Sequence, residues 1–194
     1  YANLNRALMG ADRPDNLRIS GTYDLPFGKG QKLAPAGAAG QILGGWHLNS
    51  VFSAYSGAPF SASGGNINTP GFTQRANQVK TDVAKLGNVG NGQLFFDTSA
   101  FVAAPTGVIG NAGYNTLRGP GVVNVDCSVF RDFKPAERVT IQFRAQALNA
   151  TNTPHFSNPS GNVTAANYGQ VTGVSAPTRL IDERYLRFGL KIKF

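Results

Sequence analysis

The C-terminal stretch RYLRFGLKIKF, residues 184–194, alternates apolar and polar side chains up to its last residue. Successive side chains of a β-strand point to opposite faces, so one face of this strand carries Leu186, Phe188, Leu190, Ile192 and Phe194. The other face carries Tyr185, Arg187, Gly189, Lys191 and Lys193. Chain ends fray unless they are held in place. So regular a pattern predicts a structural strand from about residue 179 to residue 194.

Four further segments have a two-residue period, at residues 16–27, 45–57, 122–133 and 138–149. The clearest, residues 138–149, separates an apolar side from a polar side formed by Thr140, Gln142, Arg144 and Gln146. In residues 122–133 the apolar side holds Val123, Val125, Cys127 and Val129. The sides of residues 45–57 are less distinct, because Val51 falls with the polar residues. The sequence therefore predicts an all-β, antiparallel fold with about five long strands.

Composition and charge exclude several other classes of protein. The 194 residues include 24 Gly and only 14% charged residues, which is unlike a helical protein. The net charge of +8 is dispersed along the chain without a basic stripe, so we expect no nucleic-acid partner. The single cysteine, Cys127, excludes an intrachain disulfide and a multi-cysteine metal site. Because the chain begins at Tyr1 without a leader, we read residues 1–194 as the C-terminal part of a longer protein.

The connections between the predicted strands alternate in length. Residues 28–44 and a tight turn at residues 134–137 form the shorter connections, whereas residues 58–121 and 150–178 form long polar ones. If neighbouring strands are antiparallel, both long connections emerge at one end of the sheet. This asymmetry is typical of outer-membrane barrels, which have short periplasmic turns and long outer loops.

Strand length favours a membrane barrel but the period alone does not decide it. A strand that spans a membrane needs roughly 9–11 residues, whereas strands of soluble sheets centre on about five or six. The apolar sides could face lipid, or they could pack against each other in a secreted β-sandwich adhesin or carbohydrate-binding module. If the chain is a barrel fragment, five strands cannot close, since the smallest membrane barrels have about eight strands. The isolated chain is then an open curved sheet.

Five blocks of sequence resemble, in order, the C-terminal barrel of TonB-dependent receptors of the Oar-like type. In that type the N-terminus carries a carboxypeptidase-regulatory-like domain. The blocks are DRPDNLRISGTYDLPFGKGQK, GGWHLNSVFSAYSGAPFS, FFDTSAFVAAPTGVIGNAGYNTLRGPGVVNVDCSVFRDF, QFRAQALNATNTPHFSNPSG and RYLRFGLKIKF. The resemblance implies the last strands of a barrel of about 22 strands in the outer membrane of a Gram-negative bacterium. It also implies that the plug, the coupling segment and the N-terminal strands lie outside this chain.

The resemblance implies partners and candidate residues. The partners are outer-membrane lipid and lipopolysaccharide, the barrel assembly machinery, and the TonB complex, which acts through the N-terminal plug. The assembly machinery would read the terminal strand, with Phe188, Leu190, Ile192 and Phe194 as its signal. The polar sides of residues 138–149 and 179–194, taken without the resemblance, give the candidates for the barrel lumen, which are Gln142, Arg144, Gln146, Arg187 and Lys191.

A substrate is not assigned by the sequence. Contacts are expected from the first long connection, particularly from Asn66, Asn68, Arg75, Asn77, Phe95, Phe96, Phe101 and Tyr114. No enzyme is expected, because His47 and His155 have no partner at ligand spacing and the few carboxylates do not converge. No cofactor or metal is expected either.

Overall fold

The computed structural model describes residues 6–27, 33, 42, 44–64, 74–175 and 182–194. The chain divides into two units. The sheet unit comprises residues 17–54, 123–154 and 178–194, and the loop unit comprises residues 1–16, 55–122 and 155–177. Among the described residues, no helix combines the length and the hydrophobicity needed to cross a membrane.

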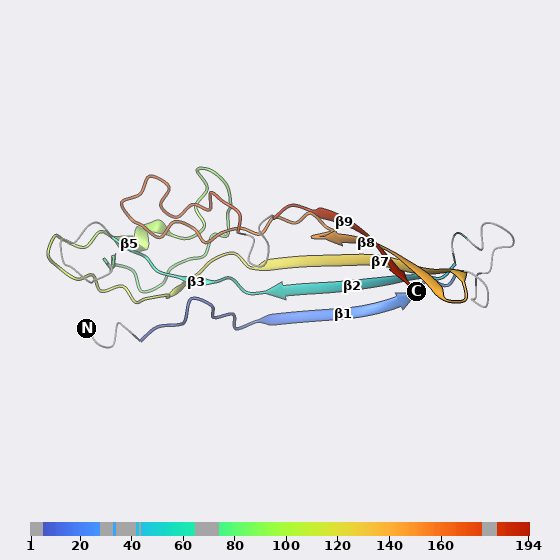
Figure 1. Cartoon of the computed structure of the whole chain (residues 1–194). Helices are drawn as coiled ribbons and strands as arrows, with labels where there is room; N and C mark the ends of the chain where they lie inside the picture. The colour runs from blue at the N-terminus through green and yellow to red at the C-terminus, as the bar shows by residue number, and fades with distance from the viewer. Residues whose placement is uncertain (1–5, 28–32, 34–41, 43, 65–73, 176–181) are drawn as a thin grey trace. The chain divides into compact units, whose positions relative to one another are not determined.

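The sheet unit is a single five-stranded sheet. Its strands are β1 (Asn16–Asp24), β2 (Trp46–Tyr55), β7 (Val122–Ala136), β8 (Val139–Leu148) and β9 (Tyr185–Lys193). They lie in the order β1-β2-β7-β8-β9, so each strand pairs with its neighbours along the chain. β7, β8 and β9 pair antiparallel, and β1 and β2 also run in opposite directions (Figure 1). The prediction of an all-β, antiparallel fold with about five long strands is confirmed, and the isolated sheet is open.

The register of β8 and β9 confirms the predicted faces of both strands. Side chains of directly opposed residues lie on the same face. On the apolar face the pairs are Ile141 with Ile192, Phe143 with Leu190, Ala145 with Phe188 and Ala147 with Leu186. On the polar face they are Gln142 with Lys191, Arg144 with Gly189 and Gln146 with Arg187.

Ring contacts settle the faces of β2, which the sequence left indistinct. The ring of Trp46 meets that of Phe143 edge-on, with centroids 6.1 Å apart. Ser50 Oγ lies 3.5 Å from Cys127 Sγ on the same apolar face. His47, one residue from Trp46, instead stacks on Phe130 at 5.0 Å. Trp46 therefore lies on the apolar face of the sheet and His47 on the polar face.

The apolar face of the sheet is not covered by a second layer. Phe188, Leu190 and Ile192 on β9 are 69%, 66% and 56% exposed, and Leu17 and Ile19 on β1 are 54% and 58% exposed. A β-sandwich would bury the same side chains between its two sheets. The structure therefore contradicts the sandwich alternative for the described part of the chain.

Two predicted boundaries at the hairpin end of the sheet need correction. The turn predicted at residues 134–137 is only Glu137–Arg138, because β7 continues to Ala136, which pairs with Val139. The register shifts between Phe133 and Ala136. A bulge of this kind accommodates Pro135, which has no N–H to donate to the ladder. At the C-terminus the ladder ends at Lys193, so Phe194 follows the strand and is fully exposed.

The described part of the loop unit contains only short elements, which surround its own core. These are β3 (Pro59–Phe60), β4 (Asn77–Gln78), the 3-10 helix η2 (Thr98–Ala100), β5 (Phe101–Val102) and β6 (Leu117–Arg118). β3 pairs with β6, and β4 pairs with β5. The core holds Phe60, Ala62, Ala76, Phe95, Phe96, Ala100, Phe101, Ala112 and Val171. Both long connections therefore fold together, with Val171 supplied by the second.

Candidate functional site

The polar face of the sheet carries all five predicted lumen residues, Gln142, Arg144, Gln146, Arg187 and Lys191. Gln146 and Arg187 are directly opposed, as are Gln142 and Lys191. The guanidinium of Arg187 lies over the ring of Tyr185 at 5.6 Å. The structure thus brings these residues together on one face. That this face lines a lumen stays a prediction, because the sheet is open.

A row of polar and aromatic side chains crosses four strands of this face. Asp24 Oδ1 on β1 lies 2.5 Å from His47 Nδ1 on β2. The His47 imidazole stacks on Phe130 of β7, and the Arg144 guanidinium of β8 lies 5.3 Å from the centroid of the same ring. The row ends at Gly189, where an added Cβ would meet no atom within 4 Å. The guanidinium side chain of Arg144 therefore lies beside open space above Gly189.

Sequence reasoning missed the pairing of Asp24 with His47. It treated His47 as having no carboxylate partner, because the two residues lie 23 positions apart. The signal was available in the alternation, which places both residues on polar sides of consecutive strands. Spacing within one strand could not show it, since the contact forms across a strand pair.

Arg131 lies on the apolar face and was not assigned by the sequence. It is directly opposed to Phe143, while Phe130 lies on the polar face opposite Arg144. The guanidinium lies 4.5 Å from the centroid of the Phe133 ring and 6.0 Å from that of Trp46, and its Nη1 donates to Ile42 O at 2.6 Å. A lipid-facing arginine costs about 2–4 kcal/mol at mid-bilayer but only about 0–1 kcal/mol near the interface. Arg131 is the tenth of the 15 residues of β7, and its long side chain among aromatic rings can extend the guanidinium toward the interface.

β9 presents its predicted signal residues on one exposed face of an edge strand. Phe188, Leu190 and Ile192 share the apolar face, and Phe188 stacks with Phe143 at 6.5 Å between centroids. Among the described residues β9 pairs with β8 alone, so its other edge has no partner strand there. A free edge can pair with another strand. Recognition by the assembly machinery stays a prediction.

Asn149 is a buried hydrogen-bonding hub at the end of β8. It is 1% exposed and has a φ of 48°. Its Nδ2 donates to Thr153 O at 3.0 Å and to Asp182 O at 2.7 Å, while its Oδ1 accepts from Thr153 N. Its own N–H donates to Asp126 Oδ1 on β7 at 2.9 Å. One asparagine thus ties the ends of β7 and β8 to the residues that precede β9.

The loop unit corrects part of the predicted substrate contacts. Phe95, Phe96 and Phe101 are each 3% exposed in the core, so the expectation that they contact a substrate is wrong. Tyr114 is 42% exposed, with the Arg75 guanidinium 5.8 Å from its ring centroid. Asn77 Oδ1 accepts from the backbone N–H of Asn111. Asn66 and Asn68 lie outside the described residues.

A groove opens between two segments of the loop unit. It has a volume of about 510 Å³. It is lined by Val89, Gly90, Asn91, Phe156 and residues 171–174. Gly90 N–H donates to Val171 O at 3.3 Å across it. The mixture of apolar side chains, a primary amide and backbone groups is typical of small ligand sites.

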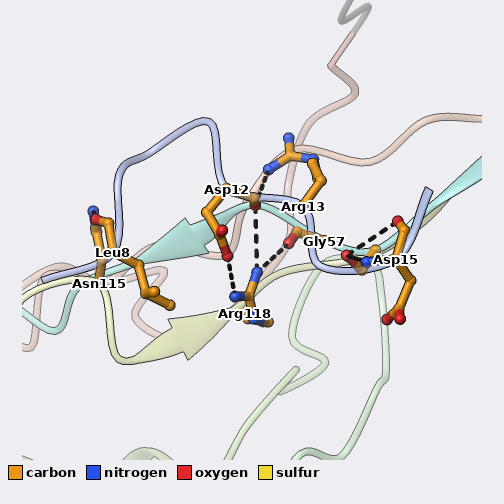
Figure 2. Close-up of polar contacts among 8 residues, drawn as sticks. Leu8, Asp12, Arg13, Asp15, Gly57, Asn115 and Arg118 are labelled. Carbon is orange, nitrogen blue, oxygen red and sulfur yellow. Dashed lines mark hydrogen bonds and ion pairs between the residues drawn. The ribbon is translucent and has the colours of Figure 1, made fainter.

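Residues 8–15 are bound to the first long connection, as Figure 2 shows. Arg118 on β6 forms an ion pair with the Asp12 carboxylate, and its Nη1 donates to Asp12 O and Gly57 O, each at 3.3 Å. Asn115 Nδ2 donates to Leu8 O at 2.7 Å. The segment before β1 therefore belongs to the same unit as both long connections.

The negative charge of the Asp97 carboxylate is stabilised by hydrogen bonds from residues around η2. Lys80 Nζ donates to Asp97 Oδ2 and to Ser99 Oγ, each at 2.6 Å, and the Ser99 N–H donates to Asp97 Oδ1. These hydrogen bonds, that of Lys80 first, lower the pKa of Asp97 from 3.8 to about 2. Desolvation by burial, with Asp97 nearby, raises the pKa of Tyr168 to about 12.

We expect Lys80→Gln to raise the pKa of Asp97 from about 2 toward 3.8, because the largest cause of the shift is removed. A carboxylate whose pKa is lowered in the folded state stabilises it above the unfolded pKa. The contribution is therefore complete above pH 3.8 and is lost as the pH falls through about 2. A carboxyl NMR titration of both proteins measures the change. Lys85→Gln, which removes a lysine that lies over the Phe95 ring, is the control and leaves the titration unchanged.

No group of three His, Cys, Asp or Glu side chains in the described part of the chain is arranged to hold a metal ion. His155, which is buried at 7% exposure, lies in the loop unit, whereas His47 lies in the sheet unit. That the protein needs no metal or cofactor stays a prediction.

The chain matches the model of a known protein family. The family described as outer membrane beta barrel domain matches residues 1–185. Comparisons with curated proteins and with solved structures find no match. The match covers the loop unit up to and including its last residues and the sheet unit from β1 to β8, and it ends at Tyr185, the first residue of β9. The protein is located in the outer membrane of a Gram-negative bacterium, and the chain belongs to the outer membrane beta barrel domain family.

Proposed function

We propose that this chain forms the last strands and outer loops of a TonB-dependent receptor of the Oar-like type. The receptor takes up a substrate through a barrel of about 22 strands, with energy supplied by the inner membrane. Membership of the outer-membrane barrel family supports the part of this proposal that makes the chain a piece of a barrel. The resemblance of five sequence blocks, in the same order, supports the part that makes the barrel a TonB-dependent receptor of the Oar-like type.

The distribution of the connections carries the proposal. Both long connections and the segment before β1 fold as one loop unit with its own core, whereas β7 and β8 are joined by two residues. Antiparallel order sends these three long segments to one end of the strands. Outer-membrane barrels have their long loops outside and their short turns in the periplasm. The loop unit is therefore extracellular, and the Glu137–Arg138 hairpin is periplasmic.

The two units have separate roles in uptake. The loop unit, with its groove and with Tyr114 exposed, supplies the first contacts with the substrate. The polar face of the sheet, with Arg144, Arg187 and Lys191, lines the lumen. Side chains that face the lumen keep their hydration, and their charges are tolerated there. The chain performs no chemistry on the substrate and binds no nucleic acid.

The partners follow from the same arrangement. Lipid and lipopolysaccharide surround the apolar face. The assembly machinery reads β9 through Phe188, Leu190, Ile192 and Phe194. The TonB complex acts through the N-terminal plug.

Binding of the periplasmic domain of TonB tests the proposal. The protein is purified from outer membranes in a mild detergent and immobilised, and the purified TonB domain is passed over it. We expect saturable binding, with none to a general porin prepared in the same way. If the TonB domain binds neither protein, the chain belongs to another class of outer-membrane barrel and the proposal is wrong.

A further inference from the structure

We propose that the polar face of β8 and β9 binds an aromatic carboxylate in the space above Gly189. The ring of the ligand stacks on the Arg144 guanidinium, and its carboxylates meet Arg187 and Lys191. The inference deepens the proposed function, since it names a substrate class. It rests on the part of that function in which the polar face lines the lumen, and not on TonB coupling.

The polar face of this strand pair carries positive charge only. Neither β8 nor β9 contains an Asp or a Glu. Their four cationic side chains all lie on the polar face and are Arg144, Arg187, Lys191 and Lys193. In the described part of the chain no carboxylate forms an ion pair with any of these four side chains. An anion is therefore the ligand whose charge complements this face.

One acid of the neighbouring strand lies in the same row as Lys191 but is engaged by another residue. Asp132 on β7 is directly opposed to Gln142, which is in turn opposed to Lys191. The Asp132 Oδ1 accepts from Gln142 Nε2 at 2.8 Å. Gln142 thus stands between the carboxylate and the lysine, and the Lys191 ammonium is left for an anion from solution.

A stack of planar groups leads up to the space above Gly189. His47, Phe130 and Arg144 lie on successive strands, with the two ring centroids 5.0 Å apart and the guanidinium carbon 5.3 Å from the Phe130 centroid. Neighbouring strands lie about 4.8 Å apart, so these three groups rise from the sheet side by side. On the next strand the residue opposed to Arg144 is Gly189, where an added Cβ would meet no atom within 4 Å. The stack therefore has an open position for one more planar group, next to Arg144.

An aromatic ring that carries carboxylates fits this position. Guanidinium planes stack on aromatic rings. Arg187 and Lys191 are two residues before and after Gly189 on the same face, so each lies roughly 7 Å from it along the strand. A carboxylate at the rim of the ring is within reach of either long side chain, and a guanidinium binds it through two hydrogen bonds. The Arg187 guanidinium lies over the Tyr185 ring without an ion pair, so it can turn toward the ligand.

Isophthalate, which carries two carboxylates on one benzene ring, is the probe for this site. The protein is purified from outer membranes in an uncharged detergent, and binding is measured by isothermal titration calorimetry at low ionic strength. We expect saturable binding of isophthalate. Binding should be about fivefold weaker or more for cyclohexane-1,3-dicarboxylate, which lacks the aromatic ring, and for isophthalamide, which lacks the charges.

Two variants locate the binding on the polar face. Arg144→Gln removes the cation and Gly189→Leu fills the open position, and each should weaken isophthalate binding about tenfold or more. The matched controls lie on β1. Arg18→Gln removes a cation there, and Gly21→Leu adds the same side chain at a glycine whose added Cβ would also meet no atom within 4 Å. Both controls should leave binding unchanged, and heat-modifiable gel mobility shows that each variant is folded.

Three results would overturn the proposal. The first is that the unsubstituted protein shows no saturable binding of isophthalate. The second is that cyclohexane-1,3-dicarboxylate or isophthalamide binds as tightly as isophthalate. The third is that folded Arg144→Gln or Gly189→Leu binds isophthalate as its control does. Since the titration contains no TonB, its outcome is separate from that of the TonB-binding experiment. A protein that binds isophthalate at this site but does not bind the TonB domain would keep this inference and lose the receptor class.

Discussion

Asn149→Ala is expected to lower the free energy of unfolding by about 2–5 kcal/mol. Alanine removes the side chain that donates to Thr153 O and Asp182 O and accepts from Thr153 N. A buried polar group left without a partner costs about 1–3 kcal/mol. The φ of 48° adds about 1–2 kcal/mol, since residues other than Gly, Asn and Asp rarely adopt this conformation. Urea unfolding of the protein in detergent measures the total.

Two further variants separate the causes of this loss. Asn149→Gly relieves the backbone conformation and should recover about 1–2 kcal/mol, but not the part that comes from the side chain. Asn167→Ala alters an exposed asparagine of the loop unit and should change stability by less than about 0.5 kcal/mol. If Asn149→Ala costs no more than Asn167→Ala, the hub does not hold the ends of β7, β8 and β9 together.

Phe96→Ala is expected to destabilise the loop unit by about 3–5 kcal/mol, the usual cost of deleting a buried phenylalanine. Phe96 is 3% exposed, and its ring centroid lies 5.7 Å from that of Phe60, 6.4 Å from that of Phe101 and 5.6 Å from that of Tyr168. These rings come from three stretches of the chain, around residue 60, residues 96–101 and residue 168, so the loss of their contacts loosens both long connections at once. Limited proteolysis of the purified protein measures the effect as faster cleavage within residues 74–175.

The sheet is expected to survive this substitution, because the core that contains Phe96 lies wholly within the loop unit. Fragments that contain β7 and β8 should therefore keep their heat-modifiable mobility. Tyr114→Ala is the control, since Tyr114 is an exposed aromatic of the same unit, and it should leave the cleavage rate unchanged. Equal cleavage of the Phe96→Ala and Tyr114→Ala proteins would show that the long connections are not a packed unit.

The strands and their faces could be predicted from the sequence because a local period encodes them. The alternation in residues 138–149 and 184–194 placed Arg144, Gln146, Arg187 and Lys191 on one face, as the register shows. The hairpin boundary was misplaced by Pro135, since a bulge lets a strand continue through a residue that normally marks a turn.

The loop unit could not be predicted because it has no period. Its core joins Phe60, Phe96 and Val171, which are separated by long stretches of turn-rich sequence. A phenylalanine in such a stretch is equally consistent with a ligand contact and with a core, and only the tertiary contacts show that it is core. The exchange of Phe130 and Arg131 between the two faces was missed for a different reason. The two-residue period shows which face each side chain lies on. It does not explain why an arginine lies on the apolar face or a phenylalanine on the polar face.

The central claim is that the apolar face of the sheet meets lipid and the polar face meets water. In a Cys127→Ser background, single cysteines at positions 187–192 of β9 are labelled with a nitroxide, and the protein is placed in phospholipid bilayers. Accessibility is then measured to oxygen, which concentrates in lipid, and to a nickel chelate, which stays in water. We predict high oxygen accessibility at Phe188→Cys, Leu190→Cys and Ile192→Cys, and high nickel accessibility at Arg187→Cys, Gly189→Cys and Lys191→Cys. Low accessibility of the first set to both reagents would contradict the claim, since it would mean that this face is covered by protein.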